Sequence, residues 1–242
     1  MFTYSITAYL VGFVSIVYWI VSVSHLIPEI SIDQEPKVSF LLALLNNLVL
    51  VALFGVQHSV MARPWFKDTF ANYFPRAIER STFILVSGLL LFFLIKQWQP
   101  MGGLIWDVTS NRIVNYTMYA LFFIGWTILF ISTFLTNHFE FFGLRQMYCD
   151  VFSKPYQPLK FKAIGFYKYM RHPIYFGGML GLWATPVMTI THLVFAIALS
   201  AYFVIGTLFE EKDLRQEFGD RYRHYVSTTP KYIPFTMKKK TK

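Results

Sequence analysis

Charged residues are scarce in this chain. They make up 14% of its 242 residues, whereas soluble domains contain about 25%. The longest gap, residues 173–209, holds 37 positions without an Asp, Glu, Lys or Arg. Because charged side chains normally cover the surface of a soluble protein, this composition excludes an ordinary soluble domain and predicts an integral membrane protein.

Cysteine is nearly absent as well. The single cysteine, Cys149, excludes an internal disulfide and argues against a cysteine-rich metal site. We expect it to be a packed residue rather than a nucleophile, and we predict no metal ligands elsewhere. No heptad, low-complexity segment or repeat of 20–50 residues stands out. The sequence therefore predicts one domain over residues 1–242.

The lengths of the uncharged runs predict the helices. A helix that crosses a bilayer needs about 20 apolar residues, whereas the 37-residue run is too long for one helix and suits two short ones joined by a turn. Four earlier runs suit one helix each: 5–27, 38–61, 81–95 (extended by a snorkelling Lys96) and 113–137. We expect an all-α fold with about six membrane-embedded helices, the last two forming a hairpin.

The tail after residue 210 predicts a further helix on the cytoplasmic side. Leu214, Phe218, Tyr222 and Tyr225 recur at helical spacing and form one apolar stripe. The alternative is an amphipathic helix that lies on the lipid surface. Pro230 ends any such helix.

Basic residues predict the orientation in the membrane. If the N-terminus is cytoplasmic, 19 of the 22 Lys and Arg residues fall on the cytoplasmic side, and only Lys37, Lys96 and Arg112 fall outside. This bias is typical of membrane proteins, so we expect both termini in the cytoplasm and the chain in a bacterial inner membrane. The bias also accounts for the net charge of +9. The partner that it indicates is the lipid bilayer, not nucleic acid, and we infer no obligate protein partner.

Two ionisable clusters flank the 37-residue run. Arg171 and His172 precede it, and Glu210 and Glu211 follow it. A hairpin returns to the side from which it started, so these four residues should lie together, and ionisable groups at a membrane boundary are functional candidates. The first helical turn, which begins at Pro173, offers free N–H groups to an anion.

Adjacent carboxylates on a helix point in different directions, so each acid can serve a different partner. One would bind an ammonium or hydroxyl group of a ligand, and the other would fix Arg171 or Arg215. Plainer interpretations remain open. The acid pair can be a solvated helix face, Arg171 a membrane anchor, and Gly177, Gly178 and Gly181 a surface for close helix packing.

The spacing of these motifs resembles a known family. The pattern Arg-His-Pro-x-Tyr begins at residue 171, and Glu-Glu-x-x-Leu-x-x-x-Phe-Gly-x-x-Tyr-x-x-Tyr covers residues 210–225, within a region of resemblance from 165 to 234. It is similar to the membrane-embedded methyltransferases that include isoprenylcysteine carboxyl methyltransferases and phospholipid methyltransferases. The resemblance implies S-adenosylmethionine (SAM) as cofactor and residues 138–242 as the cofactor-binding half, after four spans in 1–137. It implies these cofactor-binding residues: Tyr169, Arg171, His172, Tyr175, Glu210, Glu211 and Arg215.

The N-terminal half narrows the resemblance. Motifs at residues 57–64, 97–100 and 137–146 resemble the methanethiol S-methyltransferases, over nearly the whole chain. This resemblance implies an enzyme that methylates a small thiol, methanethiol, to dimethyl sulfide. Two alternatives stay open. One is a methyltransferase acting on isoprenylcysteine carboxyl groups or phospholipids. The other is a haem-binding membrane protein of the denitrification-associated type, with His58 and His138 as axial ligands.

The chemistry needs a thiolate, because a free thiol such as Cys has a pKa of about 8.5 and is mostly protonated at neutral pH. A general base or a nearby cation supplies it. The candidate catalytic residues are His58, His138, Glu140 and Arg145, the last to orient Glu140 or stabilise the thiolate. Alternatively, His58 belongs to a buried polar pair, and His138 and Glu140 cap a helix. His25 and His192 fall on the outer side and are left out of the site.

Overall fold

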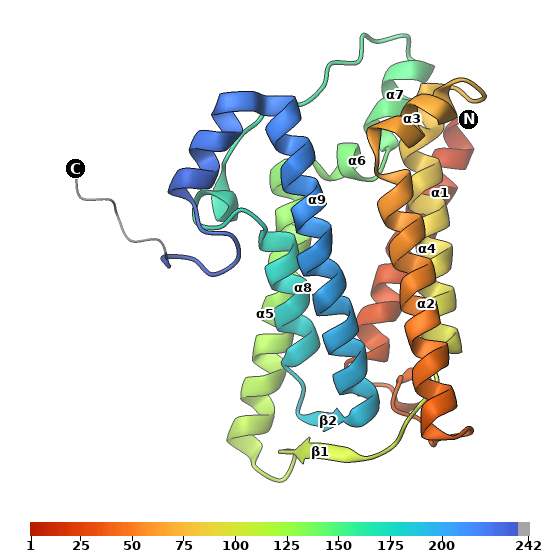
Figure 1. Ribbon diagram of the computed structural model, residues 1–242, viewed down its shortest axis with the longest axis vertical. Helices are drawn as coiled ribbons and strands as arrows, with labels where there is room; N and C mark the ends of the chain where they lie inside the picture. The colour runs from red at the N-terminus through yellow and green to blue at the C-terminus, as the bar shows by residue number, and fades with distance from the viewer. Residues whose placement is uncertain (237–242) are drawn as a thin grey trace.

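The computed structural model describes residues 1–236 and shows a bundle of long helices along one axis (Figure 1). Lys238, Lys239, Lys240 and Lys242, counted above on the cytoplasmic side, lie outside this range. The long helices are α1 (Phe2–Ser22), α2 (Phe40–Met61), α4 (Glu79–Gln97), α5 (Arg112–Thr136) and α9 (Ile190–Thr228). The short elements are α3 (Pro64–Ala71), α6 (His138–Phe141), α7 (Leu144–Val151), α8 (Pro173–Trp183), β1 (Leu104–Asp107) and β2 (Val187–Thr189).

The prediction of an all-α membrane protein is confirmed. Among the described residues, five helices are long and apolar enough to cross a membrane, and α8 adds a shorter, 11-residue helix. Large apolar side chains on these helices, such as Leu41, Val49 and Ile113, are exposed, as expected of surfaces that face lipid. The small antiparallel pairing of β1 with β2 is a feature that the uncharged runs did not indicate.

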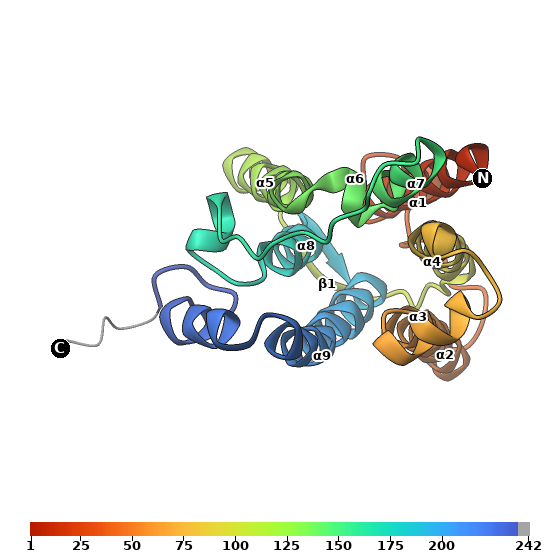
Figure 2. The ribbon, with the colours of Figure 1, turned by 90° about the horizontal axis from the view of Figure 1, so that it is seen from above.

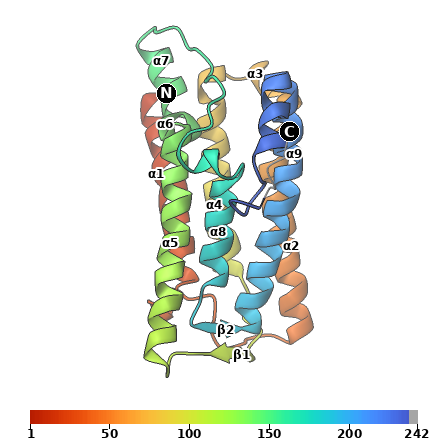
Figure 3. The ribbon, with the colours of Figure 1, turned by 90° about the vertical axis from the view of Figure 1, so that its left-hand side faces the viewer.

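The predicted hairpin is formed by α8 and α9. β2 lies at its turn and pairs with β1 at the end of the bundle opposite α6 and α7 (Figures 1 and 3). The two helices differ in length, because α9 does not stop at the end of the apolar run but continues to Thr228. The start of α8 and the middle of α9 therefore lie at the same end of the molecule, which we call the α7 end.

The expected tail helix is the last part of α9. Gly219 interrupts the helical geometry with φ 55° and ψ −131°, and the chain changes direction there (Figure 1). Residues other than glycine rarely adopt this conformation. Around the break, Phe161 contacts Phe218, Tyr222 and Tyr225, with ring centroids 5.1–5.6 Å apart. The apolar stripe therefore packs against the segment before α8 rather than lying bare on lipid.

Seen from above, the helices form two groups, with α1, α2 and α4 on one side and α5, α8 and α9 on the other (Figure 2). Glycines bring helices close within each group. A Cβ atom on Gly88 of α4 would lie 2.9 Å from the Cα of Gly12 of α1, and one on Gly125 of α5 would lie 2.5 Å from the backbone N of Gly181 of α8. Small residues permit such contacts in membranes. Close helix packing is thus the role of Gly181, as the plainer interpretation held.

Aromatic and aliphatic side chains join the two groups in a common core. Trp19 of α1 and Trp126 of α5 make an edge contact with centroids 4.8 Å apart. Phe195 of α9 is fully buried and meets Trp98 in the same way. Such pairs contribute about 0.5–1.5 kcal/mol beyond the burial of their area.

The close contact between α5 and α8 at Gly125 predicts that a larger residue there destabilises the protein. We expect Gly125→Ala to lower the thermal unfolding temperature of the detergent-solubilised protein by several degrees. Its Cβ would meet backbone atoms of Gly177 and Gly181 at 2.7 Å and 2.5 Å, and overpacking of this kind costs about 1–3 kcal/mol. Gly206→Ala is the control, because nothing lies within 4 Å of its added Cβ. Equal unfolding temperatures for the two variants would mean that the helices are not in close contact.

Candidate active site

The start of α8 is held in place by the chain that follows α9. The backbone N–H of Arg171 donates to the carbonyl of Pro230 at 2.9 Å, and that of His172 donates to the carbonyl of Lys231 at 3.1 Å. Pro173 occupies the first helical position, where no N–H is needed. Pro230 ends α9 and so lets the chain turn back. The segment that follows α9 therefore holds Arg171 and His172 in place at the start of α8.

Glu211 is the centre of an ion-pair cluster. One carboxylate oxygen accepts from Arg171 Nε at 2.9 Å and from His172 Nε2 at 3.0 Å, and the other accepts from Arg215 at 3.0 Å. Its side chain is only 7% exposed. A buried carboxylate is stable in a protein only when donors satisfy it in this way. Both oxygens of Glu211 thus accept hydrogen bonds from the protein, so this residue positions the cluster.

Arg171 is committed to the same framework. Besides Glu211, its guanidinium donates to the backbone carbonyls of Val226 and Thr229 at the end of α9. These carbonyls have no partner within the helix. Arg171 therefore ties α8 to the C-terminal turn of α9, and the membrane-anchor interpretation does not describe it.

Glu210 differs from its neighbour. Its Oε2 atom is buried, has no hydrogen-bond partner among the described residues, and lies 3.7 Å from Nδ1 of His172. The side chain as a whole is 42% exposed, and the hydroxyls of Tyr167 and Tyr175 lie close enough to interact with its carboxylate. A buried polar atom without a partner costs free energy and calls for an explanation. An atom of this kind beside aromatic rings suits a ligand that brings its own hydroxyl or ammonium donors.

The three remaining predicted cofactor-binding residues differ in whether the structure brings them to the acid pair. Tyr175 lies beside His172, with ring centroids 5.6 Å apart, and Arg215 joins through Glu211 although it is partly exposed. Tyr169 is half exposed and contacts Phe235, so the structure does not bring it to the acid pair. Tyr232 was missed by the sequence analysis, yet its ring lies 5.9 Å from that of His172.

His138 lies buried where α5 gives way to α6. Thr133 donates its hydroxyl proton to the carbonyl of Phe130, so it accepts from Nδ1 of His138 at 2.8 Å. Nε2 is then the lone-pair nitrogen, and it accepts from the hydroxyl of Tyr9 at 3.1 Å. Burial lowers the pKa of His138, which keeps the ring neutral at pH 7. Both ring nitrogens thus have protein partners, and neither is free to ligate haem.

Glu140 and Arg145 form the predicted pair, at 2.6 Å. The carboxylate of Glu140 also accepts from Gln146 and from the hydroxyl of Tyr156. This interaction and burial raise the pKa of Tyr156, while Glu140 raises the pKa of Arg145. Arg145 further donates to the carbonyl of Gln157. The pair therefore fastens the long segment after α7 to α6.

His58 on α2 differs from His138 because only one of its ring nitrogens has a hydrogen-bond partner among residues 1–236. Its Nδ1 lies 3.2 Å from the hydroxyl of Ser87 on α4, and Nε2 has no hydrogen-bond partner within residues 1–236. Aromatic rings of Phe83 and Tyr202 flank it, at 4.6 Å and 6.1 Å. One ring nitrogen is therefore available to accept a hydrogen bond from a ligand.

Arg63 follows α2 and Arg80 lies in the first turn of α4, and the two arginines have different partners. Arg63 does form an ion pair, with Asp213 at 2.9 Å. Arg80 instead donates through Nε to the carbonyl of Phe141, and its guanidinium lies over the rings of Phe83 and Phe141 at 4.7 Å and 5.0 Å. No carboxylate among the described residues lies within 4.0 Å of it.

Arg80 lies near residues on both sides of the site, the cluster of α8 and α9 and His58 of α2. Glu79, Glu140 and Tyr175 lie close enough to interact with its charge, and so does His58. One cation without a close acid partner thus stands between the acid cluster of α8 and α9 and the histidine side of α2. A cation in this place can stabilise an anion that the protein itself does not supply.

Helices that span a membrane, with an Arg–His–Glu cluster where α8 meets α9, define a membrane-embedded methyltransferase of the class that the motifs resemble. A family model described as Phospholipid methyltransferase matches residues 120–221. The chain is 41% identical over 236 residues to the methanethiol S-methyltransferase of Crocosphaera subtropica, covering 98% of this chain and 92% of that protein.

Two further relatives carry the same name. Methanethiol S-methyltransferase 1 of Bradyrhizobium diazoefficiens is 43% identical, covering 97% of this chain and 82% of that protein, and the enzyme of Mycobacterium tuberculosis is 40% identical, covering 96% and 95%. The chain therefore belongs to the methanethiol S-methyltransferase family and is an enzyme of the methyltransferase class. No solved structure matches it.

Proposed function

We propose that this chain transfers a methyl group from SAM to methanethiol and releases dimethyl sulfide, S-adenosylhomocysteine and one proton. The observation that carries the proposal is the unpartnered, buried Oε2 atom of Glu210 beside His172 and Tyr175, in a chain whose relatives are named for methyl transfer to methanethiol. Orientation follows the basic residues, so the α7 end faces the cytoplasm of a bacterial inner membrane.

The residues at the α7 end fit SAM. Glu210 offers an acceptor for ribose hydroxyls or an ammonium group, His172 and Tyr175 lie beside it, and aromatic faces attract a sulfonium. Arg171, Glu211 and Arg215 hold this arrangement by their mutual bonds. When bound, SAM supplies an activated methyl group on a positively charged sulfur. Tyr169 remains a prediction from the family pattern.

The acceptor side needs a thiolate, and Arg80 is placed to favour one. Its guanidinium lowers the free energy of a nearby anion, and it has no acid partner within 4.0 Å among residues 1–236. His58 is the stronger candidate to accept a hydrogen bond from the thiol and orient it, because its Nε2 atom is available whereas both nitrogens of His138 are used. His138, Glu140 and Arg145 then position the wall of the site. The surrounding apolar helices exclude water, which favours a reaction in which opposite charges disappear.

A product assay tests the proposal. Purified protein given SAM and methanethiol should produce dimethyl sulfide, measured by gas chromatography of the headspace. An isoprenylcysteine analogue and phosphatidylethanolamine vesicles, given in place of the thiol, should yield no methylated product. Methylation of either one without dimethyl sulfide would replace the thiol by that acceptor. The purified protein should also lack the Soret absorption of haem.

A further inference from the structure

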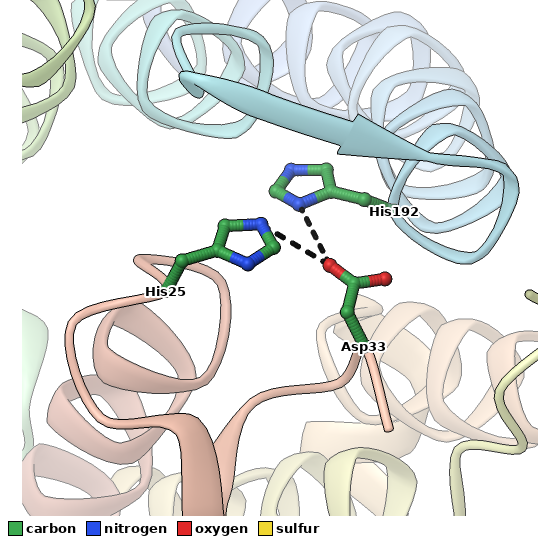
Figure 4. A group of neighbouring side chains, drawn as sticks. All are labelled: His25, Asp33 and His192. Atoms are coloured by element: carbon green, nitrogen blue, oxygen red, sulfur yellow. Dashed lines mark ion pairs between the residues drawn. The ribbon is translucent and has the colours of Figure 1, made fainter. Parts of the chain in front are cut away.

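A second cluster of ionisable side chains lies at the opposite end of the bundle, far from Glu210. His25 comes shortly after α1, Asp33 precedes α2, and His192 is in the first turn of α9 (Figure 4). His25 Nε2 is 3.1 Å from Asp33 Oδ2, and His192 Nδ1 is 3.7 Å from the same oxygen. The segment between α1 and α2 thus presents two ligand atoms, and the distant start of α9 presents a third, to a common point.

We propose that His25, Asp33 and His192 bind a zinc ion that ties the segment between α1 and α2 to the start of α9. The three ligand atoms lie within 4.8 Å of one another. In a tetrahedral zinc site with bonds of 2.0–2.1 Å, neighbouring ligand atoms are about 3.3 Å apart. The present separations need only small side-chain movements to reach this geometry.

The positions of the ring protons support a cation here. His192 Nε2 lies 2.8 Å from the carbonyl of Leu182, and a carbonyl only accepts, so Nε2 carries the proton. Nδ1 then presents a lone pair to the carboxylate of Asp33, which is also an acceptor. Metal-binding histidines are typically fixed in this way, by a second-shell carbonyl on the other nitrogen.

His25 is the third member of the cluster. Its ring lies close to the backbone of Val187, and within residues 1–236 its Nε2, Asp33 Oδ2 and His192 Nδ1 are all buried without a hydrogen-bond partner. The side chain of His192 is fully buried and that of Asp33 is 7% exposed. Two of these buried atoms, Nδ1 of His192 and Oδ2 of Asp33, are both acceptors, and their closeness is unfavourable unless a positive charge lies beside them. Two imidazoles and one carboxylate form a ligand set that zinc accepts.

The surroundings leave room for a fourth ligand and hold the three in place. A cavity of about 250 Å³ opens beside the cluster and is lined by His25, Pro28, Ser31, Asp33, Gln34 and Glu35. Water or the Glu35 carboxylate can complete the coordination there. His25 has a φ of 59°, which is uncommon outside glycine and is found where a site constrains the backbone. The hydroxyl of Thr189 binds the second oxygen of Asp33.

Metal analysis of the full chain tests the proposal. The protein is purified in detergent through a tag without histidine, and metals are counted by mass spectrometry. We expect about one zinc per chain, and a chelator should remove it and lower the unfolding temperature, which added Zn²⁺ then restores. Co²⁺ supplied to the stripped protein should give the visible absorption of a tetrahedral site with nitrogen and oxygen ligands.

Variants separate this site from adventitious binding. Asp33→Asn keeps the shape of the side chain and should lose the zinc and the Co²⁺ spectrum, whereas His224→Ala, an exposed histidine on the last part of α9, should keep both. The proposal would be overturned if the wild-type protein bound neither Zn²⁺ nor Co²⁺ and if the chelator did not change its unfolding temperature. The cluster would then be an Asp that interacts with two histidines without a metal ion. Loss of metal from His224→Ala would overturn the proposal as well. These readouts do not depend on methyltransferase activity.

Discussion

Glu210→Gln is expected to weaken SAM binding by about 100-fold, which corresponds to about 3 kcal/mol for the loss of a charged hydrogen-bond partner. Within residues 1–236 its Oε2 atom accepts no hydrogen bond, and the side chain is 42% exposed, so the change should leave the unfolding temperature close to that of the wild type. Calorimetric titration of SAM and thermal unfolding of the same samples measure the two effects.

Glu211→Gln should behave differently. Glu211 accepts from Arg171, His172 and Arg215, and removal of one partner from a buried ion pair costs about 3–5 kcal/mol. This variant should lose both stability and SAM binding, because the start of α8 loses its support. Glu217→Gln, on an exposed face of α9, is the matched control and should change neither. If Glu210→Gln unfolds early and Glu211→Gln stays stable, the roles assigned to the two acids are reversed.

The sequence predicts that these two acids lie near Arg171 and His172, but it does not predict which acid has which role. The hairpin followed from the length of an uncharged run, since a bilayer fixes how many apolar residues a span needs, and its return brought Arg171, His172 and the acid pair together as predicted. Successive side chains on a helix point about 100° apart. Which acid meets Arg171 therefore depends on the rotation of α9 against α8, and no residue pattern within one helix gives this rotation.

Other features depend on contacts between distant segments. Arg80 looks in the sequence like one more basic residue at a cytoplasmic boundary, and the charge bias explains it fully. Its place between Phe83 and Phe141 exists only because α6 packs under the start of α4. His25 and His192 were likewise assigned correctly to the same end, yet only the fold shows that their rings stack 5.6 Å apart with Asp33 beside them.

Arg80→Met is expected to lower the turnover of methanethiol by about 100-fold, while SAM affinity changes little. The loss of a cation beside a developing anion removes about 3 kcal/mol of stabilisation. A nearby positive charge lowers the pKa of a thiol. The wild-type rate should therefore level off at a lower pH than the rate of the variant, which should continue to rise about tenfold per pH unit as the free thiol ionises.

Two further variants make this prediction specific. Arg80→Lys keeps the charge and should recover part of the turnover and the earlier plateau, although it lacks the planar donor that meets Phe141. Arg76→Met removes an exposed arginine that pairs only with Asp68 on the surface, and surface pairs contribute little, so its pH profile should match the wild type. A variant of Arg80 that loses SAM affinity in proportion to turnover, with an unshifted pH profile, would place this cation on the cofactor rather than on the thiolate.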